Sequence, residues 1–180
     1  MPKMFYVFCH LSSYHTRGYS LSLPGRLIMG LTGKLIAEIG LKSSVDQHYK
    51  LWSSKPHHVP DSASKHVQSC NLVEGAFGNP NSIIIWNCTV EGKAQFIKQR
   101  VEDIDDKTTS VRFNSTDGDL MDIYKILIAI VEVEPKVEST NVVKWTSEYE
   151  KSSESSPEPI ESLGLLIGIT KDIEADHLHA

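Results

Sequence analysis

The chain has 180 residues, of which 40% are hydrophobic and 23% charged, and its formal net charge is −5 at pH 7. These values suit one soluble domain of ordinary size, and the acidic balance gives no support for binding to nucleic acid or to an anionic membrane. No apolar run approaches the roughly 18 residues that a membrane helix needs, so membrane insertion is not expected. Three cysteines without metal-ligand spacing favour a reducing compartment, the cytoplasm, over a disulfide framework.

The N-terminal residues 1–28 differ from the rest, since they contain three basic residues and no acidic one. The sequence GRLIMGLTGKL follows at residues 25–35, but it lacks the lysine-hydroxyl ending of a phosphate-binding loop. A start at Met29 would also place Lys34 where a myristoylation signal needs Ser or Thr. Residues 1–28 are either a transit peptide or an upstream extension without structure, such as one that results from an error in the gene model. We favour the extension.

The next segments are predicted to form one strand and two short helical turns. Alternating apolar and polar positions predict the strand at residues 34–42. Ser44 and Gln47 have the spacing of a capping box, which predicts that a short helix begins there. Pro56 and Pro60 interrupt this helix and start a second short turn.

Six further strands are predicted, separated by segments of turn composition such as Glu91-Gly92. They cover residues 65–74, 82–90, 93–104, 108–115, 124–134 and 141–150. A linker rich in Ser, Glu and Pro at residues 151–159 precedes a last helix that is apolar on most of its circumference. Such a helix is expected to be covered on nearly all sides. We therefore predict an α+β fold in which a curved antiparallel sheet wraps around the last helix.

Several short stretches resemble motifs of the major latex proteins, a branch of the plant Bet v I family. They are MGLTGKL at 29–35, WN at 86–87, VEGK at 90–93, GDL at 118–120, YK at 124–125, VKWT at 143–146, EYEK at 148–151 and ITKDI at 169–173. The matches follow the family's order and spacing over residues 29–180, which makes Met29 the expected functional start of a single domain. The resemblance implies the helix-grip fold of the START-like superfamily. In that fold a seven-stranded antiparallel sheet wraps around a long C-terminal helix, with two short helices, over a large hydrophobic cavity.

The resemblance also implies a non-catalytic carrier or sensor, associated with plant defence and without cofactor or metal. Its ligand would be an amphipathic or hydrophobic small molecule resembling a hormone, flavonoid, sterol or fatty acid. The alternative is an enzyme of specialised metabolism, of the cyclase or Pictet–Spengler type, with Lys98, Glu102 and Tyr149 in the same cavity. The loop at residues 75–81 keeps only two glycines of the family's glycine-rich loop, and Pro80 lacks an N–H, so phosphate binding and ribonuclease activity are not expected.

Transferring the family's inward face position by position implies a set of ligand-binding residues, each of which is alternatively plain core. The set is Trp52, Ile84, Trp86, Cys88, Phe96, Lys98, Arg100, Val111, Phe113, Leu127, Ala129, Val143, Trp145, Ser147, Tyr149, Leu163, Leu166, Ile167 and Thr170. A mostly apolar wall with a few polar groups is usual for a small-molecule pocket. An inward cation is costly unless paired or solvated, so the cations of the set would meet a ligand acid, a nearby carboxylate or water at the mouth.

The strand at residues 124–134 carries Ile126, Ile128 and Ile130 on the face opposite to the predicted inward one. An exposed apolar stripe tends to mark an interaction surface. One hypothesis is weak self-association, so that the protein is a monomer or a weak dimer. The alternative is that long side chains of neighbouring strands, such as Lys144 and Glu148, cover the stripe.

Overall fold

The computed structural model describes residues 31–135 and 140–179, so the predictions for residues 1–28 lie outside it. Its strands are β1 (Thr32–Leu41), β2 (Val67–Glu74), β3 (Ile83–Val90), β4 (Lys93–Asp105), β5 (Ser110–Gly118), β6 (Tyr124–Pro135) and β7 (Asn141–Lys151). Its α-helices are α1 (Val45–Ser53), α2 (Val59–Ala63) and α3 (Ile160–His179), with short 3-10 helices at Pro56–His58 and Asp119–Asp122. No helix in these residues is long and apolar enough to cross a membrane.

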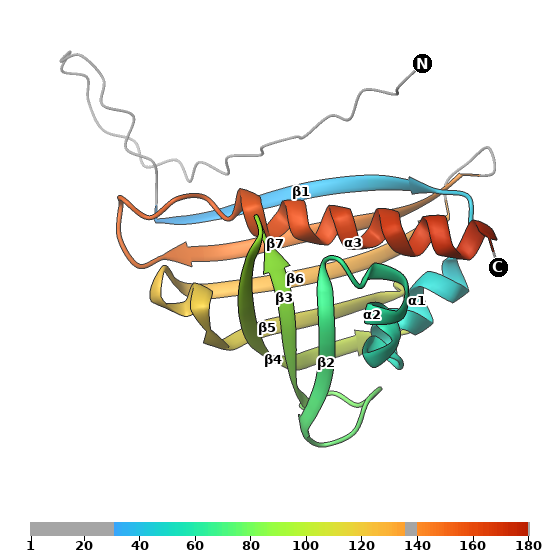
Figure 1. Ribbon diagram of the computed structural model, residues 1–180, viewed down its shortest axis with the longest axis horizontal. Coiled ribbons are helices and arrows are strands. Elements are labelled where there is room, and N and C mark those ends of the chain that lie inside the picture. Colours follow the sequence, from blue (N-terminus) through green and yellow to red (C-terminus); the bar gives the residue numbers. More distant parts are fainter. Residues whose placement is uncertain (1–30, 136–139, 180) are drawn as a thin grey trace, which may run out of the picture.

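The seven strands form one antiparallel sheet in the order β1-β7-β6-β5-β4-β3-β2. The first strand therefore lies beside the last one, and β2 forms the opposite edge of the sheet. Helix α3 packs along β1 and β7, while α1 and α2 lie near its C-terminal end (Figure 1). This arrangement confirms the predicted fold class, a sheet that wraps around the C-terminal helix.

Two local signals in the sequence form the structures that they predicted. The Ser44 side chain accepts a hydrogen bond from the backbone N–H of Gln47 at 3.2 Å, and the Gln47 side chain accepts one from the Ser44 N–H at 3.4 Å, which completes the capping box of α1. Glu91 and Gly92 both have positive φ angles, of 48° and 78°. This is the backbone of a two-residue type I′ hairpin turn, and it pairs Val90 with Lys93.

A glycine on β1 makes room for an aromatic ring on β7. Gly33 lies opposite Tyr149 in the sheet, and a Cβ atom on Gly33 would lie only 2.2 Å from the Tyr149 hydroxyl. The tyrosine is buried, so its ring has little space in which to move away. Tyr149 thus packs over β1 because residue 33 has no side chain.

The isoleucine stripe on β6 is largely covered. Ile128 is 9% exposed and Ile130 is half-buried, while Ile126 remains 42% exposed. Arg112 on β5 donates from Nη2 to Glu148 Oε2 on β7 at 3.0 Å, so this ion pair reaches across β6. The finding favours the alternative that neighbouring side chains lie over the stripe, and it weakens the support for self-association there.

Helix α3 is buried less completely than its composition predicted. Leu163, Ile169 and Ile173 are buried against the sheet. The residues 165–167 between them are only half-buried, and the apolar residues near the two helix ends are exposed. The helix therefore has one covered face and a partly accessible flank.

Candidate functional site

An apolar cavity of about 60 Å³ lies in the hollow between the sheet and α3. Its wall combines side chains of α1, of α3 and of every strand except β1. The lining residues are Trp52, Val67, Trp86, Cys88, Ile97, Gln99, Phe113, Ala129, Trp145, Leu165, Leu166 and Ile169. This makes the cavity the best candidate among the described residues for a small-molecule site.

The cavity is smaller than the large one that the resemblance implied. Ligand pockets typically measure roughly 300–1,000 Å³. Three tryptophan rings occupy much of the space here, because Trp52 packs edge-on against Trp145 with ring centres 4.9 Å apart and lies 6.3 Å from Trp86. A ligand of ordinary size therefore enters only if these side chains, or those of α3, move.

Apart from Phe96, Lys98 and Arg100, the predicted lining residues lie on the inner side of the molecule, where they fall into two groups. The structure brings one group together on the cavity wall: Trp52, Trp86, Cys88, Phe113, Ala129, Trp145 and Leu166. The second group is not on the wall but is buried around it, except for the half-buried Ile167: Ile84, Val111, Leu127, Val143, Ser147, Tyr149, Leu163, Ile167 and Thr170. For this second group the structure favours a role as core.

The predicted inward position of Phe96, Lys98 and Arg100 is wrong. In the sheet Phe96 pairs with Asn87 on the outer face, and it is 39% exposed. The inward residues of β4 are the neighbouring ones, including Ile97, which pairs with Trp86. An error of one residue along a strand moves every side chain to the other face of the sheet.

The hairpin turn contained the signal that gives the correct face. A two-residue turn at Glu91-Gly92 pairs Val90 with Lys93, and counting back from this pair places Trp86 opposite Ile97. Directly opposed residues share a face. Sequence reasoning also missed Val67, Gln99, Leu165 and Ile169, and for Gln99 the same count would have found its inward position.

The indole N–H groups on the wall have unequal surroundings. Trp86 Nε1 donates to Gln99 Oε1 at 3.0 Å. Trp145 Nε1 donates to Thr170 Oγ1 at 2.8 Å, and that hydroxyl donates to the carbonyl of Leu166 at 2.9 Å. Trp52 Nε1 is buried and has no partner among the described residues.

The wall carries no charged side chain. Among the lining residues in the described part of the chain none is Asp, Glu, Lys, Arg or His. Burial, together with the negative charge of Asp119, raises the pKa of the Cys88 thiol to about 11, so this sulfur is protonated at neutral pH. The cavity therefore presents an uncharged surface with few polar groups.

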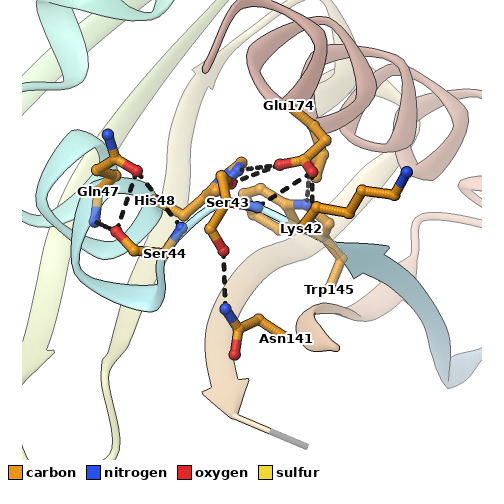
Figure 2. Close-up of polar contacts among 9 residues, drawn as sticks. Lys42, Ser43, Ser44, Gln47, His48, Asn141, Trp145 and Glu174 are labelled. Atoms are coloured by element: carbon orange, nitrogen blue, oxygen red, sulfur yellow. Dashed lines mark hydrogen bonds and ion pairs between the residues drawn. The ribbon is translucent and has the colours of Figure 1, made fainter. Parts of the chain in front are cut away.

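A carboxylate near the C-terminal end of α3 holds α1 in place beside the cavity. Glu174 accepts hydrogen bonds from the backbone N–H groups of Lys42, at 2.6 Å, and Ser43, at 3.3 Å, and also from the Ser43 hydroxyl (Figure 2). The ring nitrogen Nε2 of His48 lies 3.2 Å from Glu174 Oε2. We call these contacts the Glu174 clamp. Because His48 and Trp52 are four residues apart on α1, they share a helix face, and the clamp helps to position the tryptophan.

Burial and hydrogen bonding together determine the ionisation of the clamp. His48 is fully buried, and this burial lowers its pKa, outweighing the hydrogen bond to Glu174 that acts in the opposite direction. Burial opposes ionisation of Glu174 as well, but its hydrogen bonds from Ser43, Lys42 and His48 prevail and lower its pKa. At neutral pH the clamp is thus an ionised carboxylate with a neutral histidine that donates from Nε2.

The three groups named for an enzymatic alternative do not meet. Lys98 lies on the outer face of β4, whereas Tyr149 lies on the inner face of β7. Glu102 binds Arg112 Nε at 3.0 Å and Asn114 Nδ2 at 2.6 Å, away from the cavity. The structure therefore does not assemble the lysine, acid and phenol in one site.

A metal site needs a group of ligating side chains, and a phosphate site needs a row of free backbone N–H groups. No group of three or more His, Cys, Asp or Glu side chains in residues 31–135 and 140–179 could hold a metal ion. In the loop after β2, the backbone N–H groups of Asn79, Asn81 and Ser82 donate to carbonyls of Ala76, Val101 and Asn79. They are thus already engaged and do not form a free row of donors for a phosphate.

Residues 30–180 match the pathogenesis-related protein Bet v 1 family. The chain is 34% identical to MLP-like protein 28 of Arabidopsis thaliana over 151 residues, which cover 83% of this chain and 45% of the relative. It is 34% identical to MLP-like protein 34 of the same plant over 149 residues, covering 82% and 47%. The chain thus spans about half the length of these two relatives, but it covers 94% of MLP-like protein 31, at 32% identity over 162 residues and 89% of this chain.

Solved structures show the same architecture. The crystal structure of ginseng major latex-like protein 151 from Panax ginseng superposes with a TM-score of 0.81 at 41% identity, covering 83% of this chain and 99% of that one. Norcoclaurine synthase from Thalictrum flavum, solved in complex with dopamine and hydroxybenzaldehyde, gives a TM-score of 0.68 at 20% identity, covering 90% and 98%. At that identity the second likeness concerns the fold alone.

Proposed function

The chain belongs to the pathogenesis-related protein Bet v 1 family, and on that basis we propose that it is a non-catalytic carrier or sensor of a hydrophobic small molecule in plant defence or stress responses. The fold of this family supports ligand binding. The proposal adds that binding occurs in the cavity between α3 and the sheet. It also places the protein in the cytoplasm, which the free thiols of Cys70 and Cys88 support.

The observation that carries the proposal is the partly enclosed apolar cavity with tryptophans on its wall. Trp52, Trp86 and Trp145 come from three elements that are far apart in the sequence, yet all three line the cavity, and the Trp52 ring lies near both of the others. Aromatic walls with few polar groups are typical of small-molecule sites. Catalysis, in contrast, needs a reactive group, and the wall offers none that is charged at neutral pH.

Ligand entry requires the cavity to expand from its volume of about 60 Å³. Leu165 and Leu166 on α3 belong to the wall but are half-buried, so they form its least enclosed part. An unfilled apolar space loses dispersion contacts, which favours a contracted state when no ligand is bound. We therefore propose that these leucines move outward when a ligand enters.

A fluorescence titration with N-phenyl-1-naphthylamine, an uncharged apolar dye, tests the proposal. The dye should quench tryptophan emission and brighten as it binds. Leu166→Asp should weaken this binding at least about tenfold, because it places a charge on an apolar wall without a partner. Phe96→Asp is the matched control, since it adds the same charge on the outer face and should leave the affinity unchanged.

Circular dichroism should first show that both variants are folded. Equal affinity of the two variants, or an effect of Phe96→Asp alone, would place the dye outside the cavity and contradict the proposed site. Turnover of a bound compound into a new product would contradict the non-catalytic part of the proposal.

A further inference from the structure

The unpaired indole of Trp52 lies beside the cavity. Trp52 is 3% exposed, and its Nε1 has no hydrogen-bond partner in the described residues. The two other tryptophans on the wall are matched controls within the same molecule, since Trp86 donates to Gln99 and Trp145 donates to Thr170. The difference is therefore specific to one position and is not a general property of this wall.

A buried N–H group without an acceptor is unfavourable, and native structures leave few of them. A water molecule is not expected to act as the acceptor for Trp52 Nε1 in this cavity, because an ordered internal water needs two to four polar partners. Gln99 is a polar residue of the wall, but its side chain is already bonded to Trp86 and to Ser115. An acceptor atom on an incoming molecule would satisfy Trp52 Nε1 once the cavity has expanded around that molecule.

The uncharged wall restricts the ligand further. A carboxylate or ammonium group that enters loses its hydration, and the lining residues include no opposite charge to replace it. The cations that sequence reasoning had placed inside, Lys98 and Arg100, belong to the outer face of β4. A single N–H donor suits a neutral acceptor better than an anion, which needs several donors or a cation.

We propose that the cavity selects uncharged, apolar molecules that carry a hydrogen-bond acceptor, such as a carbonyl oxygen, and that Trp52 Nε1 donates to this acceptor. The inference rests on the proposed function, because it assumes that this cavity binds a small molecule. It adds a chemical class, neutral aromatic or aliphatic carbonyl compounds, and excludes free acids. It also assigns to the N–H group of Trp52 a role in specificity, in addition to the packing role of the indole ring.

The test uses three one-ring probes of similar size: acetophenone, which is neutral and has an acceptor, ethylbenzene, which has none, and benzoate, which is charged. The chain contains three tryptophans, so a ¹⁵N–¹H spectrum resolves three indole N–H signals, assigned with single Trp→Phe variants. Acetophenone should move the Trp52 signal downfield and bind about five- to tenfold more tightly than ethylbenzene, the gain expected for one hydrogen bond. Benzoate at pH 7 should bind at least tenfold more weakly than acetophenone.

Trp52→Phe removes the donor and keeps an aromatic ring. It should abolish the advantage of acetophenone over ethylbenzene while ethylbenzene still binds. Equal binding of the two neutral probes by the wild type, an unmoved Trp52 signal, or benzoate binding as tightly as acetophenone would overturn the inference and leave the proposed function standing. Failure of all three probes to displace N-phenyl-1-naphthylamine would overturn the inference as well, and absence of dye binding would overturn both. If the Trp52→Phe variant does not fold, the Trp52 signal and the relative affinities of the three probes for the wild type still test the inference.

Discussion

Removal of the Glu174 clamp should destabilise the protein and loosen α1 against α3. The Glu174→Ala variant deletes the acceptor of two backbone N–H groups, of the Ser43 hydroxyl and of His48 Nε2 (Figure 2). The Lys42 N–H lies near the surface, where water replaces the carboxylate, whereas Ser43 is buried and its donors are reached less easily by water. His48 is fully buried, so its donor is left without a partner.

The magnitude follows from these environments. An unsatisfied buried donor costs about 1–3 kcal/mol, and the lost net contribution of one further hydrogen bond is about 1 kcal/mol. The sum is about 2–4 kcal/mol of unfolding free energy. For a domain of this size 1 kcal/mol corresponds to about 2–4 °C in Tm, so Tm should fall by about 4–16 °C. Glu174→Gln keeps an acceptor oxygen and loses only the charge, so its effect should be about half as large.

Thermal unfolding followed by circular dichroism measures this effect, with urea unfolding as an independent estimate of the free energy. Glu154→Gln is the control, because Glu154 is an exposed residue whose change should alter stability by less than about 0.5 kcal/mol. A Tm of Glu174→Ala within 2 °C of the wild type would refute the reasoning. It would mean that His48 finds another partner or that the clamp contributes nothing net.

Three further predictions concern other features. Burial lowers the pKa of His48, so on acidification the unfolded state binds a proton before the folded state does. The contribution of this residue to stability should therefore be complete above pH about 6.5 and be lost as the pH falls below that value. When the pH is lowered from 7.5 to 5.5, Tm should decrease more for the wild type than for His48→Gln. Gly33→Ala should lower the unfolding free energy by about 1–3 kcal/mol, since its Cβ would collide with Tyr149. Gly164→Ala, at a helix position with open space, should raise the unfolding free energy by about 0.4–1 kcal/mol. Equal effects of the two substitutions in urea titrations would contradict the packing of β1 against β7. Ile128→Lys should lower the unfolding free energy by about 1.5–3 kcal/mol, because the isoleucine is only 9% exposed. A folded variant of unchanged stability that sediments as a smaller species than the wild type would instead support self-association through β6.

Much of the fold was predictable because its signals are local. The capping box of α1 and the hairpin turn at Glu91-Gly92 depend on residues that are two to four positions apart, and both formed as predicted. The alternation in β1, β3 and β7 also identified inward residues correctly, since one face of each strand is apolar. In β4 both faces mix apolar and polar residues, so alternation was ambiguous there. The face was assigned wrongly for Phe96, although the hairpin turn fixed its pairing.

The amino-acid sequence by itself determined the order of elements, the turns, the register of the β3–β4 hairpin and the family of the chain. Only the tertiary structure decided the volume of the cavity and which polar groups in it are paired. These properties depend on how side chains from α1, from α3 and from six strands fill one shared space. No local pattern shows that Trp52 lacks an acceptor while Trp86 and Trp145 have one, because each acceptor comes from another part of the chain. Short-range preferences select the elements, whereas packing between distant elements determines the site.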